Sequence, residues 1–230
     1  MMVAAISNCL LTLVIFGGAV IVALLTAANL NRTREDRSWR LQELAVELKF
    51  DGFNPNRDEG FAMGWGFLSR LDQGEDRYAF NILRGKYHEQ VLFVFDYHFQ
   101  TGSDRSRVDH NLTVLMLVFK EAFPKLTIGS EGLGAKIAAA FGVDADIKFE
   151  SAEFSRIFCV RSPDKKFAYD VCNAQMIDYL LANRDLQVEI QGPVVLLAFE
   201  PQLPVGQIEF NLQRLIEIRS RLPEYLFTNT

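Results

Sequence analysis

An apolar run without charged side chains opens the chain. Residues 2–30 contain no Asp, Glu, Lys or Arg, and the first basic residue, Arg32, follows directly after Asn31. A helix needs about 20 such residues to cross a hydrocarbon core about 30 Å thick. The pattern predicts a single transmembrane anchor over residues 1–30, so the lipid bilayer is the first expected partner.

A cleaved secretory signal is the alternative interpretation of this run. Thr26-Ala27-Ala28 offers the small residues of a cleavage site. Residues 1–8, however, lack the Lys or Arg with which a signal peptide begins, and the run exceeds the usual 7–15 apolar residues. An uncleaved anchor is therefore the preferred interpretation.

Small residues occupy the middle of the expected span. They are Gly17, Gly18, Ala19 and Ala23, and the two alanines are four residues apart. Small side chains at this spacing let a second helix approach closely. They predict a transmembrane packing surface, and a helix that faces only lipid is the alternative.

The basic residues near the span predict its orientation. Arg32, Arg34, Arg37 and Arg40 all follow the apolar run, and none precedes it. Lys and Arg close to a span favour the cytoplasmic side. We expect a single-pass protein of the inner (cytoplasmic) membrane with its N-terminus outside and its C-terminal domain in the cytoplasm.

An amphipathic helix is expected directly after the anchor. Ser38 is a typical N-cap, and apolar residues follow it at helical spacing; they are Trp39, Leu41, Leu44, Ala45 and Leu48. Gly52 and Pro55 are typical of a helix end. Residues 31–56 are therefore predicted to form a juxtamembrane segment whose apolar face packs against a core.

Alternating apolar and polar positions then predict a β-meander. The expected strands are Tyr78–Arg84 and His88–Gln100, on either side of Gly85-Lys86, and a returning strand over Val108–Lys120. The last of these is apolar on both faces, as in a central strand that is covered on both sides. Glycines at positions 60, 64 and 66 argue against a long helix before the meander.

Shorter elements are expected after Pro124. They are strands at 126–128 and 154–160, a helix at 171–183, a hairpin of strands 186–190 and 194–199, and a last helix at 205–222. The fold class predicted for residues 57–230 is thus α+β, with a mainly antiparallel sheet packed by amphipathic helices. A pleckstrin-homology-like barrel with helix 171–183 inserted is the alternative.

Composition excludes some classes of function. The net charge of −5 and the sequence pI near 5.3 are the opposite of the basic surface of a nucleic-acid-binding protein. Cys9, Cys159 and Cys172 match neither a disulfide framework nor a metal-binding spacing, so buried free thiols are expected. The Gly-rich segment before Lys136 departs from a phosphate-binding loop, because Ile137 replaces the Ser or Thr that holds magnesium. No cofactor is predicted.

One group of residues could carry metal chemistry. Asp96 and His98 share one face of a predicted strand, and His110 would lie across from His98 if the intervening turn centres near Asp104. A carboxylate and two imidazoles are ligands for a divalent metal. This candidate metal site depends on the strand register, because a shift of one residue moves His110 to the other face.

Several short motifs accompany the single apolar run: the Glu43-Leu44-Ala45 helix, Phe95-Asp96-Tyr97, Thr101-Gly102-Ser103, Glu131-Gly132, Asp146-Ile147-Lys148-Phe149 and Phe154-Ser155. Together they resemble uncharacterised bacterial single-pass membrane-anchored proteins of unknown function with a cytoplasmic α+β domain, at the bacterial inner membrane. The resemblance implies this architecture and brings no activity or functional residues with it.

Three functions remain open from the sequence. The favoured one is a membrane-tethered, non-enzymatic interaction module with a protein partner, because a tether raises the local concentration of the domain near its partners. The second is an accessory subunit of a membrane complex that docks through Gly17, Gly18, Ala19 and Ala23. The third is a metal-dependent enzyme built on Asp96, His98 and His110.

Overall fold

The structure is a computed structural model that describes residues 32–87, 90–130 and 146–227. The expected anchor and its small residues Gly17, Gly18, Ala19 and Ala23 lie outside these residues, as does the Gly-rich segment after Ser130. The chain divides into two compact units, residues 1–43 and 44–230. None of the helices in the described part of the chain is long and apolar enough to cross a membrane.

The first described helix begins earlier than its sequence pattern predicts. Residues 32–47 are helical, so Ser38 lies inside the helix and is not its N-cap. Arg and Glu, which favour helices, make up most of the preceding turn. The predicted apolar face is present in part, because Leu44 and Ala45 are buried, but Trp39, which was predicted to belong to it, is 67% exposed.

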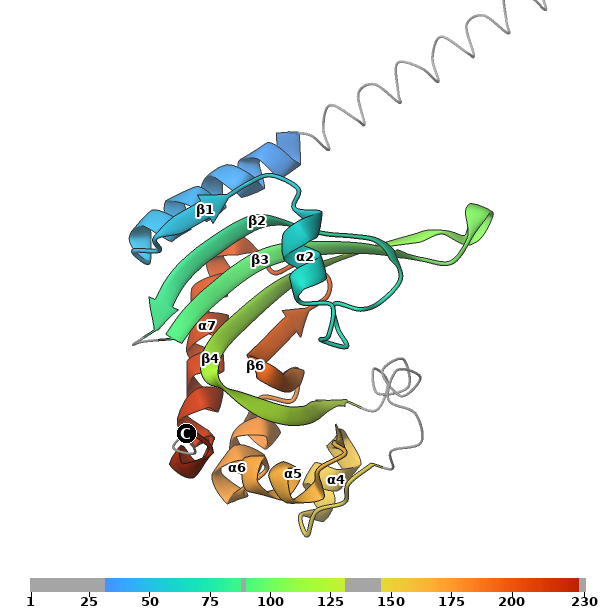
Figure 1. Cartoon of the computed structure of the whole chain (residues 1–230), viewed down its shortest axis with the longest axis vertical. Helices are drawn as coiled ribbons and strands as arrows, with labels where there is room; N and C mark the ends of the chain where they lie inside the picture. Colours follow the sequence, from blue (N-terminus) through green and yellow to red (C-terminus); the bar gives the residue numbers. More distant parts are fainter. Residues whose placement is uncertain (1–31, 88–89, 131–145, 228–230) are drawn as a thin grey trace, which may run out of the picture. The chain divides into compact units, whose positions relative to one another are not determined.

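The α+β prediction is confirmed by one antiparallel sheet of six strands (Figure 1). The strands are β1 (Gly52–Asn54), β2 (Glu75–Tyr87), β3 (Gln90–Thr101), β4 (Val108–Ser130), β5 (Phe158–Arg161) and β6 (Val188–Phe199). Their order is β1-β2-β3-β4-β5, and β6 pairs with β4 along its other edge. The sheet is open, unlike the barrel that was the alternative prediction.

β4 organises this sheet, and it is longer than the sequence predicts. Proline was expected to end the strand at Pro124, yet β4 continues to Ser130. Its pairing with β6 shifts register on both sides of Phe123. A bulge of this kind accommodates a residue that lacks an N–H group, so Pro124 bends the strand without ending it.

β6 is one strand and not the predicted hairpin. Ile190, before Gly192-Pro193, pairs with Leu126, and Val194, after them, pairs with Val118 of the same strand. Gly192 adopts a positive φ of 53° at this point, a conformation that glycine adopts without steric cost. The Gly-Pro pair therefore marks a bulge in β6 that faces the bulge in β4.

β2 likewise runs through the Gly85-Lys86 pair that was expected to be a turn. Gly85 pairs with Leu92 in the β2–β3 ladder. A Cβ atom at Gly85 would lie 2.4 Å from Cδ1 of Phe50. The glycine is thus required by the close approach of an aromatic ring and not by a change of chain direction.

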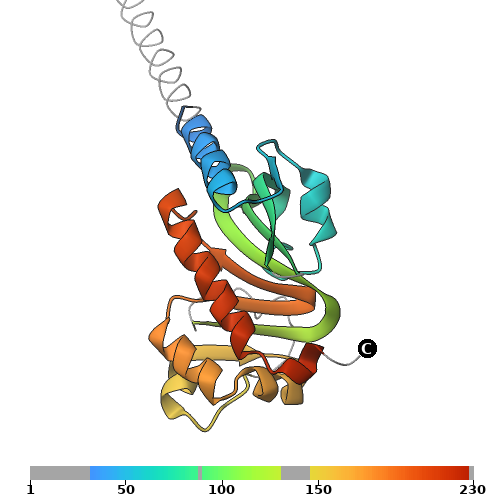
Figure 2. The same ribbon diagram turned by 90° about the vertical axis from the view of Figure 1, so that its left-hand side faces the viewer.

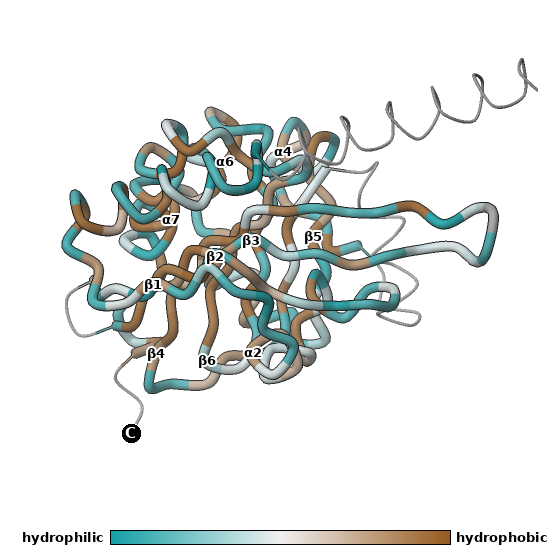
Figure 3. Tube along the Cα trace, turned by 90° about the horizontal axis from the view of Figure 1, so that it is seen from above, coloured by the Kyte–Doolittle hydropathy of each residue, from teal (hydrophilic) through white to brown (hydrophobic). Residues whose placement is uncertain are grey.

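Helices cover both faces of the sheet (Figure 2). Helix α2 (Glu59–Gly64) and the turn after it cover one face, where Phe95, Tyr97 and Phe99 form the middle of the core. Helix α7 (Ile208–Arg221) lies on the opposite face and buries Ile208, Leu212, Leu215 and Ile218. Figure 3 shows hydrophobic residues concentrated in the middle of the sheet, whereas the far end of the β3–β4 hairpin is mostly hydrophilic.

In the described residues from 146 onward, three short helices precede β6, and polar caps determine where each one begins. In α4 (Ala152–Ile157) the Ser151 side chain accepts a hydrogen bond from the N–H of Phe154, so the strand expected at 154–160 is a helix that leads into β5. Asp164 caps α5 (Lys165–Val171), and Asn173 caps α6 (Ala174–Ala182). The single helix expected at 171–183 is therefore interrupted before Ala174.

Candidate functional site

The three candidate metal ligands are not brought together. His98 pairs with Asn111, and His110 pairs with Phe99, so the predicted pairing of His98 with His110 is wrong by one residue. Side chains alternate between the two faces of a strand, so Asp96 and His98 lie on one face and His110 on the other. The described residues contain no cluster of three or more His, Cys, Asp or Glu that could hold a metal ion.

Asp96 instead joins three strands through buried hydrogen bonds. The Asp96 side chain is only 1% exposed. Asn81 Nδ2 donates to its Oδ2 at 2.9 Å, and Thr113 Oγ1 donates to its Oδ1 at 3.2 Å. The N–H of Leu203 donates in turn to Thr113 Oγ1 at 3.0 Å. This network connects β2, β3, β4 and the segment after β6, which is a structural role for Asp96.

The two imidazoles have separate partners. His98 lies with Nδ1 3.1 Å from Asn111 Oδ1 and stacks on Tyr78 with ring centroids 4.7 Å apart. His110 lies with Nδ1 2.6 Å from Glu200 Oε1 and Nε2 2.8 Å from the Thr101 hydroxyl. Each ring is held by neighbours on its own face of the sheet.

Cys159 and Cys172 are buried free thiols, as the sequence predicts, whereas Cys9 lies outside the described residues. Burial raises the pKa of Cys172 to about 12. Burial also raises the pKa of Cys159, and the nearby Asp146 carboxylate adds to that shift. Thiols in such surroundings are poor nucleophiles at neutral pH, because the thiolate is the reactive form.

A buried carboxylate fastens the turn after α2 to the sheet. Glu189 on β6 is 2% exposed and accepts hydrogen bonds from the backbone N–H groups of Ser69 at 2.5 Å and Arg70 at 3.0 Å. Burial raises the pKa of Glu189, and the two N–H donors oppose that shift. Burial also lowers the pKa of the Arg70 guanidinium, whereas the charges of Glu200 and Glu189 raise it.

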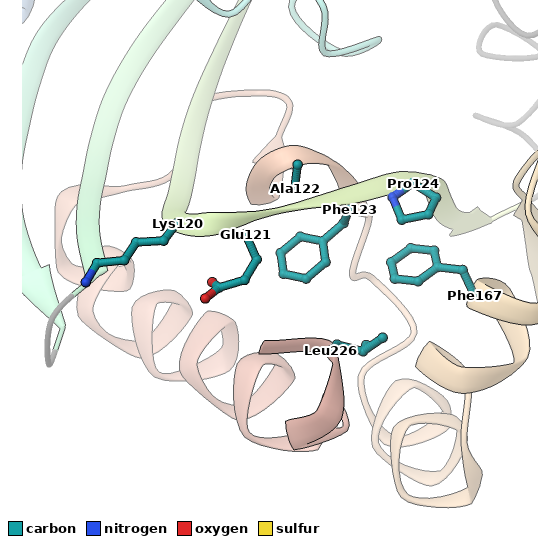
Figure 4. A pocket seen from close by; sticks show the side chains of 7 residues that line it. All are labelled: Lys120, Glu121, Ala122, Phe123, Pro124, Phe167 and Leu226. Carbon is teal, nitrogen blue, oxygen red and sulfur yellow. The ribbon is translucent and has the colours of Figure 1, made fainter. Parts of the chain in front are cut away.

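A cavity of about 350 Å³ lies where β4 bends, and sequence reasoning missed it (Figure 4). Its lining comes from the bend of β4, from α5 and from the short helix η3 (Glu224–Phe227). The lining residues are Lys120, Glu121, Ala122, Phe123, Pro124, Phe167 and Leu226. Pro124, which predicts a strand end, and the aromatic residues near it are the local signal in the sequence.

Aromatic rings form much of the wall of this cavity. Phe123 and Phe167 are both buried, and their rings are stacked with centroids 6.2 Å apart and planes 15° apart. Phe227 of η3 packs against Phe123 with ring centroids 5.4 Å apart. The cavity is thus a depression in an aromatic cluster whose members come from distant parts of the chain.

Glu121 is the acidic residue of the lining. Its side chain is half-buried, and within the described part of the chain it makes no hydrogen bond or ion pair. In Figure 4 its carboxylate lies beside the ring of Phe123, whereas the Lys120 side chain extends in another direction. The cavity therefore combines aromatic faces with one acidic and one basic residue, Glu121 and Lys120.

One solved structure has a similar fold. It is the crystal structure of the mycobacterial trehalose monomycolate transport factor A, TtfA, with a TM-score of 0.60. The alignment covers 84% of this chain and 97% of TtfA at 15% sequence identity. No family model and no curated protein matches the chain. The likeness to TtfA shows a shared fold.

Proposed function

We propose that this chain is a membrane-tethered, non-enzymatic accessory protein that binds a protein partner on the inner face of a bacterial membrane. The observation that carries the proposal is the fold similarity to TtfA, which extends over 97% of that chain. TtfA is by its name a trehalose monomycolate transport factor. We infer that the present chain serves a membrane transport system in the same accessory manner.

The sequence of the first residues supports the tether. Residues 2–30 are uncharged, and four arginines follow within ten residues, between Arg32 and Arg40. An apolar run of this length supports a span, and the position of the arginines supports a cytoplasmic domain. A tethered domain meets membrane partners at a much higher effective concentration than a free one.

The tether is tested by fractionating cells that express the full chain or a variant without residues 2–30. We expect the full chain to stay with membranes after carbonate washing and to be released by detergent, whereas the variant is recovered in the soluble fraction. A reporter fused after Thr230 should be active only in the cytoplasm. Recovery of the full chain in the wash would contradict the tether.

The accessory role is tested by crosslinking in native membranes, followed by identification of the partner. We expect a component of a transport system to be recovered with the full chain. Deletion of the encoding gene should then impair export of that system's substrate without loss of the transporter itself. Unchanged export would contradict the accessory role while leaving the tether intact.

Docking through the membrane helix is the second candidate, and the small residues favour it. Replacing Gly17 and Gly18 with isoleucine would block close approach of a second helix. We expect co-purification of the partner to fall in this variant and to remain unchanged in a conservative Ile15→Leu control. Undiminished co-purification would assign docking to the domain alone.

A further inference from the structure

A hydroxyl, an imidazole and a carboxylate form one hydrogen-bonded chain in the β3–β4 hairpin. Thr101 ends β3, His110 lies on β4, and Glu200 follows directly after β6. Thr101 Oγ1 lies 2.8 Å from His110 Nε2, and His110 Nδ1 lies 2.6 Å from Glu200 Oε1. The ring of Phe99 stacks on the imidazole with centroids 4.5 Å apart, so the plane of His110 is held by packing as well as by its two partners.

The chemistry of the three groups determines the direction of both hydrogen bonds. A carboxylate accepts hydrogen bonds, so the Nδ1–H group of His110 donates to Glu200. In the neutral imidazole Nε2 then carries no proton, and it accepts the hydrogen bond of the Thr101 hydroxyl. Glu200 thus selects the tautomer in which His110 can take the proton of Thr101. This is the order of groups in which a base activates a hydroxyl nucleophile.

The Thr101 hydroxyl lies beside an exposed apolar side chain. Thr101 is half-buried, and the side chains of His110 and Glu200 are 13% and 33% exposed. Val108 pairs with Thr101 in the β3–β4 ladder, and residues paired in this way lie on one face of a sheet with Cβ atoms about 5 Å apart. Val108 is 52% exposed. An apolar chain attached to Thr101 would therefore have an apolar surface to pack on.

We propose that Thr101 is a modification site that accepts an acyl group from an ester, with His110 as the general base. The Thr101 oxygen forms a bond to the carbonyl carbon of the ester while His110 Nε2 takes the hydroxyl proton. The bond between that carbon and the leaving oxygen then breaks, and the alcohol departs with the proton held by His110. The acyl chain stays on Thr101 and packs on Val108. This site goes beyond the proposed accessory function and does not depend on the tether.

The site is tested on the full chain in detergent micelles with p-nitrophenyl butyrate as the acyl donor. Absorbance of the released p-nitrophenol gives the rate, and mass spectrometry of proteolytic peptides gives the position of the butyryl group. We expect one equivalent of p-nitrophenol per chain and a butyryl ester on Thr101. Butyrylated lysines in the same digest report the general reactivity of the protein surface.

Variants at the hydroxyl test whether Thr101 is the acceptor. Thr101→Val, which is of similar shape, should lose the ester, whereas Thr101→Ser keeps a hydroxyl and should retain it. Comparison with the serine variant keeps the test valid if the valine variant folds less well. The control is Ser103→Ala, which removes an exposed hydroxyl two residues further along the same hairpin and should leave the reaction unchanged.

Variants at the two partners test the activation. In His110→Gln we expect acylation of Thr101 to be about 100-fold slower, as for removal of a general base. Glu200 acts through His110 and is a positioning residue, so Glu200→Gln should slow the reaction about tenfold. Glu200→Asp should restore part of that loss. Lysine butyrylation should be equal in all variants, which separates the loss of activation from a change in folding.

Two results would overturn the proposal. One is a digest in which Thr101 carries no butyryl group while lysines do. The other is acylation of Thr101 at the natural rate in His110→Gln, which would show that the imidazole does not act as the base. Release of more than one equivalent of p-nitrophenol that depends on Thr101 would support the activated hydroxyl and contradict the non-enzymatic role. Failure of this inference is therefore distinguishable from failure of the proposed function.

Discussion

Phe99 on β3 pairs with His110 on β4, and their rings stack with centroids 4.5 Å apart and planes 7° apart. This pair belongs to the β3–β4 ladder, in which His98 lies opposite Asn111. It places His110 beside Glu200, at the end of β6, on the face opposite His98. The polar residues of this hairpin therefore form two separate networks, and Asp96 belongs to the buried one.

Replacing Asp96 with alanine should strongly destabilise the domain. The carboxylate accepts hydrogen bonds from Asn81 and Thr113 in a fully buried position, and its loss leaves both donors without that acceptor. We expect the free energy of unfolding to fall by about 2–4 kcal/mol in urea denaturation. Asp178→Ala, at an exposed position of α6, is the control and should change it by less than about 0.5 kcal/mol. Equal effects of the two changes would contradict the network.

The raised pKa of Glu189 predicts a stability component that decreases as pH rises. Below the ordinary pKa of 4.5, the Glu189 carboxyl is protonated in both the folded and the unfolded chain. Above pH 4.5 the unfolded chain loses this proton first. The folded state is therefore disfavoured progressively until pH passes the raised folded pKa.

Glu189→Gln should lack this component, because an amide does not titrate. Near pH 4 we expect the variant to be less stable than the natural chain by about 1–2 kcal/mol, since its NH₂ group meets one of the two backbone N–H donors. The difference should shrink as pH rises above 4.5 in urea denaturation series. A constant difference would show that Glu189 does not titrate with the predicted shift.

Gly85 is expected to tolerate no side chain because of Phe50. A Cβ atom would lie 2.4 Å from Cδ1 of that ring, so Gly85→Ala should cost about 1–3 kcal/mol of unfolding free energy. The double variant Gly85→Ala, Phe50→Ala should cost less than the sum of the single changes. Gly64→Ala is the matched control, because nothing lies within 4 Å of its Cβ position. An additive double variant would contradict the contact.

The buried cysteines should resist thiol reagents until the domain unfolds. With the pKa of Cys172 at about 12 and that of Cys159 raised, little thiolate is present at pH 8. In a Cys9→Ala background, we expect a coloured disulfide reagent to label both thiols only as urea unfolds the chain. The folded Cys172 thiol keeps its proton above the ordinary pKa of 9.0, so its stabilising contribution is lost as pH rises from 9.0 toward about 12. Rapid labelling of the native chain would contradict the burial.

Strong periodic patterns predicted the middle of the fold. The apolar faces of β3, the doubly covered part of β4 and the last helix all follow from side-chain spacing, because each buries its apolar residues against the nearest large surface. Elsewhere, proline and glycine predicted strand ends or turns where the structure has continuous strands. Pro124 and Gly192-Pro193 lie at bulges in a long ladder, where pairing on both sides outweighs the preference of a short segment to turn.

The predicted metal site was wrong because the strands pair in a register that differs by one residue from the expected one. The loop between Thr101 and Val108 is centred half a residue later than expected, with a positive φ at Gly102 and Asp104. That shift moves His110 by one position along the ladder and therefore to the other face. Residue types alone carry no information about such a shift, because it depends on turn geometry.

The sequence by itself determined the apolar run at residues 2–30, the arginines beyond it and the α+β class, since each depends on composition or on spacing within one segment. Only the tertiary structure decided the path of β4 through its bend and the cavity beneath it. Glu121, Phe167 and Leu226 come from three separate elements, and no local pattern brings them together. Their meeting depends on long-range strand pairing and on the packing of α5 and η3 against β4.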